Sequence, residues 1–308
     1  MLAYPSKYVH VRYLYRGLMS YSKARIRDVE DLNPRFRRLV FDVDDLGRLS
    51  LPGVADEAVG LYVPSAGEHD VPDMSCRDGV WAFHDIDVAP QVRNYSIRHL
   101  DAATGSVVID VVIHSTGPVT EFAQRARPGD RVTMSHARGW YRPPPETDWQ
   151  ILVADLAGLP ALARILTESD DDASLIVVTE LGDPSDVELL PEFAGTHLSD
   201  VGGNGYTPSR LAARMRDLDL PPGRGYCWFA GEAAESRSVR KYVRSELGWG
   251  RDDYDIIGYW RHDGERWSRQ FEERGNGLFD VYRRAIADGK TEKQAAEEFD
   301  EALERAGL

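Results

Sequence analysis

The chain has 308 residues, of which 42% are hydrophobic, and this is enough apolar material for a core in each of two domains. With 37 basic and 51 acidic residues its net charge is −14, which argues against sequence-independent binding to nucleic acid or to anionic lipid. Its two cysteines, Cys76 and Cys227, are far apart and form no Cys-x-x-Cys pair, which argues against zinc, iron–sulfur ligation and a disulfide framework.

The beginning of the chain, residues 1–23, shows no clear hydrophobic period, and we expect it to form an arm. It lacks the apolar core of a signal sequence. The most apolar long stretch, residues 151–166, is interrupted by Asp155 and Arg164, so we expect no membrane insertion. These features predict a cytoplasmic protein.

The next stretch, residues 24–145, has the pattern of a first domain built from short antiparallel strands. Apolar residues recur among charged ones in residues 24–43, and glycine and proline separate the short apolar runs that follow, such as residues 59–64. Residues 68–89 contain two acidic, proline-containing patches, which predict a loop.

Residues 93–98 concentrate two guanidinium groups, an aromatic ring and a small hydroxyl in one predicted strand. Alternation places Arg93 and Tyr95 on one face, with Ser96 on the other. A flavin nucleotide needs this set, because its diphosphate takes cationic donors, its flat ring takes an aromatic neighbour and its redox nitrogen takes a small donor. An ordinary basic strand, with its tyrosine on the core, is the alternative.

A second strand, residues 105–114, leads into a Gly-Pro turn and a short helix that Thr120 could cap. A helix start binds anions through its free N–H groups and its dipole, worth about 0.3–1 kcal/mol. A charged hydrogen bond from an arginine contributes more, about 1.5–3 kcal/mol. A plain strand–turn–helix junction is the alternative interpretation.

The proline run at residues 143–145 marks a domain boundary, after which strands and helices alternate. This alternation predicts a parallel sheet with crossover helices, and its ligands should lie at the carboxyl ends of the strands. No Gly-x-Gly-x-x-Gly fingerprint occurs, and each turn by itself could be an ordinary strand–helix connection. The predicted strands are residues 150–154, 174–180, 226–231 and 255–259, and the predicted helices are residues 161–168 and 234–247.

The last residues, 265–308, are charged and helical in pattern. Residues 291–294 form a capping box, and the helix that follows has one apolar face containing Phe299 and Leu303. We expect this extension to pack on the body of the protein or on a second subunit. No metal-binding histidine spacing and no Gly-x-Ser-x-Gly elbow occur, so we expect no metal site and no acyl-transfer chemistry.

Five motifs in this order resemble the siderophore-interacting protein family, the flavin-dependent ferric-siderophore reductases of the ferredoxin-reductase-like superfamily. The resemblance spans residues 24–264. It implies an antiparallel Greek-key barrel that binds FAD (residues 24–145), an α/β domain of the NAD(P)H-binding type (residues 146–264) and a helical extension (residues 265–308). The motifs occupy residues 93–98, 114–123, 155–161, 228–233 and 258–261.

The resemblance also implies a site. Arg93 and Arg98 would bind the diphosphate or ribose, Tyr95 would stack on the flavin, and Ser96 would donate to its redox nitrogen, so Tyr95 and Ser96 are the expected catalytic residues. The expected cations for an anionic iron chelate are Arg138, Arg142 and Arg261. The remaining cofactor-binding residues are expected to be Asn94, Ile97, His114, Ser115, Gly117, Pro118, Val119, Thr120, Asp155, Ala157, Gly158, Leu159, Pro160, Gly231, Glu232, Ala233, Tyr259 and Trp260.

The implied reaction moves electrons from NADPH or NADH through FAD to a ferric siderophore and releases Fe(II). A ferredoxin donor is an alternative, although the negative net charge disfavours docking of another acidic protein. Family members usually have threonine where Ala157 stands and often lysine where Gly60 stands. A non-catalytic flavin- or siderophore-binding protein is therefore a further alternative, as is a general flavin reductase that releases its flavin.

Overall fold

The computed structural model describes residues 21–77, 80–84, 86, 90–114, 117–170, 173–275 and 277–308. These residues belong to two compact units, one ending at Trp260 and the other beginning at Arg261. Nearly all of the expected N-terminal arm lies outside the described residues. In the described part of the chain, no helix has both the length and the apolar character that crossing a bilayer requires.

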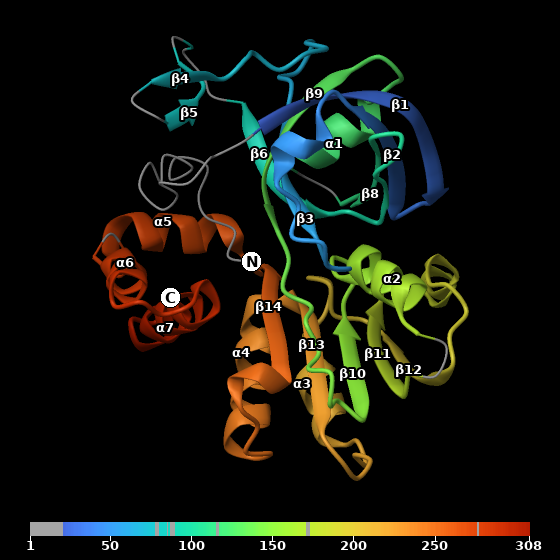
Figure 1. The fold of residues 1–308 in the computed structure, drawn as a ribbon, viewed down its shortest axis with the longest axis vertical. Helices are drawn as coiled ribbons and strands as arrows, with labels where there is room; N and C mark the ends of the chain where they lie inside the picture. Colours follow the sequence, from blue (N-terminus) through green and yellow to red (C-terminus); the bar gives the residue numbers. More distant parts are fainter. Residues whose placement is uncertain are drawn as a thin grey trace. The chain divides into compact units, whose positions relative to one another are not determined.

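The first half of the larger unit is a seven-stranded antiparallel sheet in the order β6-β3-β9-β1-β2-β8-β7 (Figure 1). The two end strands, β6 and β7, follow one another along the chain, so residues 91–101 join both edges of the sheet and close it into a barrel. The fold predicted for this half is confirmed. The strands are β1 (Tyr21–Asn33), β2 (Phe36–Val43), β3 (Ala58–Val63), β6 (Gln91–Ser96), β7 (His99–Asp101), β8 (Ser106–Val112) and β9 (Arg131–Arg138).

The barrel core forms because apolar side chains alternate along these strands and meet inside. Leu39 and Phe41 of β2 lie fully buried with Val59 and Leu61 of β3. Helix α1 (Pro118–Arg125) adds its apolar face to the same core through Phe122.

Two short elements are inserted between strands of the barrel. Residues predicted as loop contain a small antiparallel hairpin, β4 (Ser75–Arg77) with β5 (Val80–Ala82), so that expectation was wrong for these residues. A 3-10 helix, η2 (Leu46–Leu49), follows β2. Strands of three residues carry too little periodicity to be seen in the sequence.

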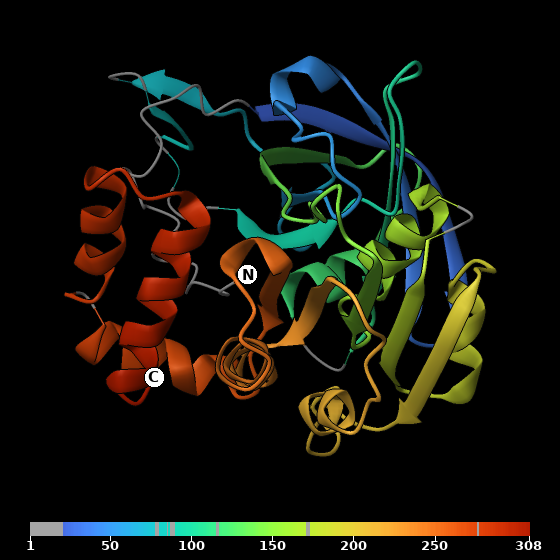
Figure 2. The same ribbon diagram turned by 60° about the horizontal axis from the view of Figure 1, so that its bottom comes forward.

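The second half of the larger unit is a five-stranded parallel sheet in the order β12-β11-β10-β13-β14 (Figures 1 and 2). Helix α2 packs on one face, and helices α3 and α4 pack on the other. The strand order reverses between β10 and β13, which is where such sheets form their ligand crevice. The elements are β10 (Trp149–Ala154), α2 (Leu159–Glu168), β11 (Leu175–Leu181), η3 (Pro184–Leu189), β12 (Gly195–Val201), α3 (Leu211–Arg216), β13 (Gly225–Glu232), α4 (Ala233–Ser245), η4 (Arg251–Asp253) and β14 (Tyr254–Trp260).

The four strands predicted for this sheet are confirmed to within one or two residues, because each is a continuous apolar run that the sheet buries. Strand β12 and helix α3 were not predicted. β12 lies at the sheet edge with most of its side chains exposed, so its composition shows no buried run. α3 has only six residues.

Two adjacent buried carboxylates, Asp56 and Glu57, join the barrel to the parallel sheet. Asp56 accepts hydrogen bonds from the backbone N–H groups of Trp140 and Tyr141, at 2.7 and 2.9 Å, and from the indole of Trp228 in β13, at 3.0 Å. Glu57 pairs with Arg164 of α2 at 3.0 Å. Both carboxylates are fully buried, and their bonds fix β3 relative to β13 and α2.

The second unit consists of three helices, α5 (Gly264–Arg274), α6 (Phe279–Ala287) and α7 (Glu292–Arg305). Both parts of the capping box predicted at Thr291 and Gln294 are present, and the predicted apolar face of α7 is buried. Phe299 on this face meets the rings of Phe271 and Phe279 edge-on. The helical prediction for this extension is confirmed.

Replacement of Asp56 by alanine should destabilise the larger unit by about 3 kcal/mol or more, because three buried N–H donors each lose a partner at about 1–3 kcal/mol. The midpoint of urea unfolding measures this effect. Asp42→Ala is the matched control, because Asp42 is exposed on the same barrel and pairs with Arg25 and Arg27 at the surface, where a pair contributes about 0–1 kcal/mol. Equal midpoints for the two variants would contradict this role of Asp56.

Candidate functional site

Strand β6 carries the residues on which the predicted site is based. Its register with β3 pairs Tyr95 with Val59 and Ser96 with Ala58, so consecutive side chains point to opposite faces, as predicted. Tyr95 packs against the barrel core, and burial raises the pKa of its phenol, which therefore stays protonated. Arg93 is exposed on the same face, close enough for its charge to act on Tyr95.

Ser96 meets the last strand of the parallel sheet. Its hydroxyl donates to the hydroxyl of Tyr259 in β14 over 3.4 Å, a contact that joins two segments 163 residues apart in the sequence. Burial raises the pKa of Tyr259, and the nearby guanidinium of Arg138 opposes that rise. Ser96, Tyr259 and Arg138 are thus brought together from β6, β14 and β9.

His136 lies close enough to Arg138 for that charge to act on it. Its φ of 53° lies in the left-handed region, at the point where the pairing of β3 with β9 slips register. Burial, together with Arg138, lowers the pKa of this imidazole to about 4, so it is neutral at physiological pH. Its Nδ1 lies 2.5 Å from the hydroxyl of Ser135. A strained backbone of this kind is common at functional sites, and no sequence pattern marks it.

Helix α1 begins without a side-chain cap from any described residue. Its N-cap is Gly117, with φ 137°. Thr120, predicted as the cap, lies one turn further on and donates its hydroxyl to the carbonyl of Val112 over 3.5 Å, so that expectation was wrong. The imidazole of His114 packs over Gly117, where a Cβ would approach it to 3.1 Å. Ser115 lies outside the described residues.

These residues fit the phosphate and ring of a flavin nucleotide. The first turn of α1 has candidate N–H donors at Val119 and Thr120, although both residues are buried, and Arg93 is an exposed cation on β6, an element that contacts α1. Tyr95 offers an aromatic ring on the face that carries Arg93. The donor set therefore matches the chemistry of FAD.

The other predicted members of the β6 motif lie among different neighbours. Asn94 stands opposite Gly60, and Ile97 is fully buried in the barrel core. Arg98 lies among Asp110, Arg38 and Arg164, and burial lowers the pKa of its guanidinium. Its Nε is buried without a hydrogen-bond partner. Arg93 and Arg98 therefore lie in different surroundings: Arg93 is exposed, whereas Arg98 is partly buried among other charged groups.

The turn after β10 is organised by Asp155, which is buried. One carboxylate oxygen accepts the backbone N–H of Ala157 at 2.9 Å, and the other accepts the indole N–H of Trp260 at 2.6 Å. Burial raises the pKa of Asp155 to about 7. The turn needs glycine at two places, because a Cβ on Gly158 would lie 2.3 Å from the carbonyl of Ala230, and one on Gly231 would lie 2.9 Å from Asp155.

The helix starts at this edge of the sheet have few donors left for a phosphate. In α2, Leu159 donates its N–H to the carbonyl of Asp155, and Pro160 has no N–H. At α4, which begins at Ala233, the side chain of Glu232 accepts the N–H groups of Ala234 and Glu235. The amides at these helix starts are thus bonded within the protein, whereas no described side chain caps the start of α1.

The three predicted substrate cations have different bonding partners. Arg138 lies beside Tyr259, whereas Arg142 donates to the carbonyl of Gly139 at 2.9 Å and gives its backbone N–H to Tyr226. Arg261 belongs to the helical unit, where its guanidinium lies 4.5 Å from the ring centre of Trp267 and 3.7 Å from Asp300.

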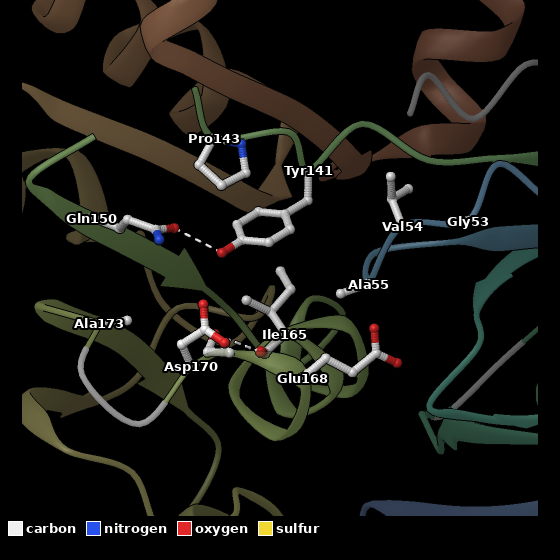
Figure 3. Close-up of a pocket in the computed structure, with 11 residues that line it drawn as sticks. Gly53, Val54, Ala55, Tyr141, Pro143, Gln150, Ile165, Glu168, Asp170 and Ala173 are labelled. Carbon is white, nitrogen blue, oxygen red and sulfur yellow. Dashed lines mark hydrogen bonds between the residues drawn. The ribbon is translucent and has the colours of Figure 1, made fainter. Parts of the chain in front are cut away.

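A cavity of about 330 Å³ lies elsewhere in the larger unit, beside the C-terminal end of α2 (Figure 3). Figure 3 shows the hydroxyl of Tyr141 directed at Gln150, with which it bonds at 2.7 Å. Glu168 and Asp170 give this cavity an acidic wall. It contains none of the predicted site residues, and Asp155 lies at the opposite end of α2. Among the described residues, no group of histidine, cysteine and carboxylate side chains is arranged to hold a metal ion.

Comparison with known proteins gives matches along most of the chain. A model described as the siderophore-interacting FAD-binding domain matches residues 25–141, and one described as siderophore-interacting protein matches residues 147–263. The chain is 27% identical to the ferric vibriobactin reductase ViuB of Vibrio cholerae, over 80% of this chain and 96% of that protein. It is 24% identical to an NADPH-dependent ferric-chelate reductase of Escherichia coli, over 75% of this chain and 89% of that protein.

A solved structure of a siderophore utilization protein from T. fusca is also similar. It shares 26% identity and superposes with a TM-score of 0.65, covering 80% of this chain and 95% of that one. The likeness includes both the antiparallel and the parallel sheet, since it extends over most of each chain.

Arg93→Ala should lower the affinity for FAD about tenfold to hundredfold, because it removes a charged hydrogen bond of about 1.5–3 kcal/mol, and each 1.4 kcal/mol is a factor of ten. Titration of the apoprotein with FAD, followed by flavin fluorescence, measures the change. Arg131→Ala is the control, since Arg131 lies at the start of β9 and pairs with Asp44 at 2.6 Å. An unchanged affinity in Arg93→Ala would remove Arg93 from the flavin site.

Asp155→Asn should change how stability depends on pH. An acid whose pKa is raised in the folded state binds more protons in the folded than in the unfolded protein. Its contribution to the free energy of unfolding therefore falls as pH rises from about 4 to about 7. The slope reaches about 1.4 kcal/mol per pH unit for one group. Urea unfolding at several pH values measures the free energy of unfolding of both proteins. The wild-type value minus the variant value should fall across this range and become constant above pH 7. Parallel pH profiles would disprove the raised pKa.

Proposed function

The chain belongs to the siderophore-interacting protein family, and we propose that it is a ferric-siderophore reductase in which electrons from NAD(P)H pass through FAD to Fe(III) held by a siderophore. Within this family it is an NAD(P)H-dependent flavoprotein oxidoreductase with FAD as its cofactor. The observation that carries the proposal is the meeting of Ser96 on the FAD-binding barrel with Tyr259 on the parallel sheet, next to Arg138.

The chemistry that FAD supplies is the conversion of a two-electron donation into one-electron transfers. Arg93 and the first amides of α1 would hold the diphosphate, and Tyr95 would support the ring. Ser96 would donate a hydrogen bond at the ring edge in place of its bond to Tyr259. Tyr259 is half-buried where the barrel meets the parallel sheet and helps to exclude water from that place.

We assign Arg138 to the ferric chelate, because its charge acts on Tyr259, the hydrogen-bond partner of Ser96. Its guanidinium attracts anionic oxygen donors, and its charge acts on both Tyr62 and Tyr259. One dinucleotide is oxidised and loses two electrons and a proton, while two Fe(III) ions become Fe(II). Hard oxygen ligands hold Fe(II) less well, so the siderophore releases the iron. We place this reaction in the cytoplasm, the compartment that supplies NAD(P)H.

The test is an anaerobic titration of the purified, yellow protein. Adding dinucleotide should bleach the flavin absorbance, and a ferric siderophore should restore it, with two Fe(II) trapped by a chelator for each dinucleotide consumed. In the same assay Arg138→Ala should raise KM for the ferric siderophore and retain FAD, whereas Arg131→Ala should change neither.

Two results would overturn the proposal. Flavin that neither dinucleotide bleaches would indicate a binding protein rather than a reductase. Flavin that separates from the protein on gel filtration would favour a general flavin reductase.

A further inference from the structure

The carboxyl edge of the parallel sheet carries a buried acidic group that the proposed reaction does not use. Glu180 is the penultimate residue of the sheet's second strand, β11, and stands directly opposite Asp200 in the pairing of β11 with β12. Glu180 is only 2% exposed. One oxygen of its carboxylate accepts the backbone N–H of Arg210 at 2.5 Å, and the Ser209 hydroxyl lies close by.

The second oxygen of Glu180, Oε2, is buried, and no described residue donates a hydrogen bond to it. It lies against Gly203, where a Cβ would come within 1.9 Å of it, so the chain leaves this position without a side chain. A buried acceptor that lacks a donor is rare and costs free energy. A ligand hydroxyl would satisfy it.

The neighbourhood of Glu180 is negative. Glu235 and Asp200 are close enough to raise the pKa of Glu180, which burial raises most. Arg214 forms a two-point bond with Asp200, so its charge is already neutralised there. The charge of Arg210 also acts on Asp200. Two guanidinium groups, those of Arg210 and Arg214, therefore stand against the three carboxylates of Glu180, Asp200 and Glu235. Asp155 and Glu232 occupy the neighbouring helix starts.

An acidic residue at the end of the second strand of a nucleotide-binding sheet accepts a hydrogen bond from the 2′-hydroxyl of the adenosine ribose in NAD(H). In NADP(H) that hydroxyl carries a phosphate. The phosphate supplies no such donor and brings further negative charge to the carboxylates, a repulsion that strongly disfavours binding.

We propose that the reductant of this protein is NADH, and that Glu180 selects it over NADPH by accepting the ribose 2′-hydroxyl at Oε2. This inference rests on the proposed function, because it assigns the nucleotide within the same reaction. Gly203 lies against Oε2, so the proposal requires segment 202–205 to move aside for the ribose. The selection comes as much from repulsion of the 2′-phosphate as from the hydrogen bond to the hydroxyl.

The test measures binding of the oxidised dinucleotides NAD⁺ and NADP⁺ to the FAD-loaded protein by calorimetry, which does not depend on turnover. The wild type should bind NAD⁺ about tenfold or more tightly than NADP⁺. Glu180→Gln keeps the size of the side chain and removes its charge, so it should narrow this ratio mainly by improving NADP⁺ binding. Asp252→Asn is the matched control, because Asp252 lies in η4, before β14, at the opposite edge of the sheet.

The outcomes test two claims: that the protein selects NADH, and that Glu180 makes the selection. Equal affinities in the wild type, or tighter NADP⁺ binding, would overturn the selection of NADH and leave the reductase proposal standing. A ratio in Glu180→Gln equal to that of the wild type would show that another group selects the nucleotide. If neither dinucleotide binds and neither bleaches the flavin, the proposed function fails together with this inference. The wild-type ratio decides the choice of NADH even if the variant does not fold.

Discussion

The buried carboxylates Asp56 and Glu57 are the constraint on which the arrangement of the larger unit depends. They leave water only because N–H groups and a guanidinium satisfy them, and those partners come from the linker after β9, from β13 and from α2. The bonds hold the beginning of β3 against the parallel sheet. Since β3 pairs with β6, the same bonds fix where Ser96 lies relative to Tyr259. The contact between the two sheets thus follows from a pair of charges outside the site itself.

The two halves of the larger unit treat their helix starts differently. In the barrel, α1 follows Gly117, and no described side chain caps its first amides. In the parallel sheet, Asp155, Glu232 and Glu235 use the amides at the corresponding places for the protein's own carboxylates. The same backbone chemistry therefore favours an anion at the start of α1 and disfavours one at the helix starts of the parallel sheet. On the proposed function, this difference would make dinucleotide binding sensitive to the number of negative charges on the ligand.

The fold could be predicted largely from sequence, because the strands of the parallel sheet are continuous apolar runs and those of the barrel alternate. Strand β12 escaped prediction because its side chains are exposed, and the hairpin of β4 and β5 because its strands are too short. The motif at residues 93–98 was recognisable because its chemistry is concentrated in one segment. Asp155 with Trp260, His136 with its left-handed backbone and Glu180 beneath Gly203 depend on contacts between distant segments, and a local pattern does not encode these.

The open start of α1 and the occupied helix starts of the parallel sheet also have a kinetic meaning. On the proposed function, a flavin held by an arginine and by uncapped amides would dissociate slowly and stay with the protein from one catalytic cycle to the next. A dinucleotide whose phosphates meet amides already bonded to carboxylates would have fewer bonds to break, so its oxidised form would leave quickly and fresh reductant would replace it. The proposal therefore implies a tightly held flavin and a rapidly exchanging dinucleotide in the same chain.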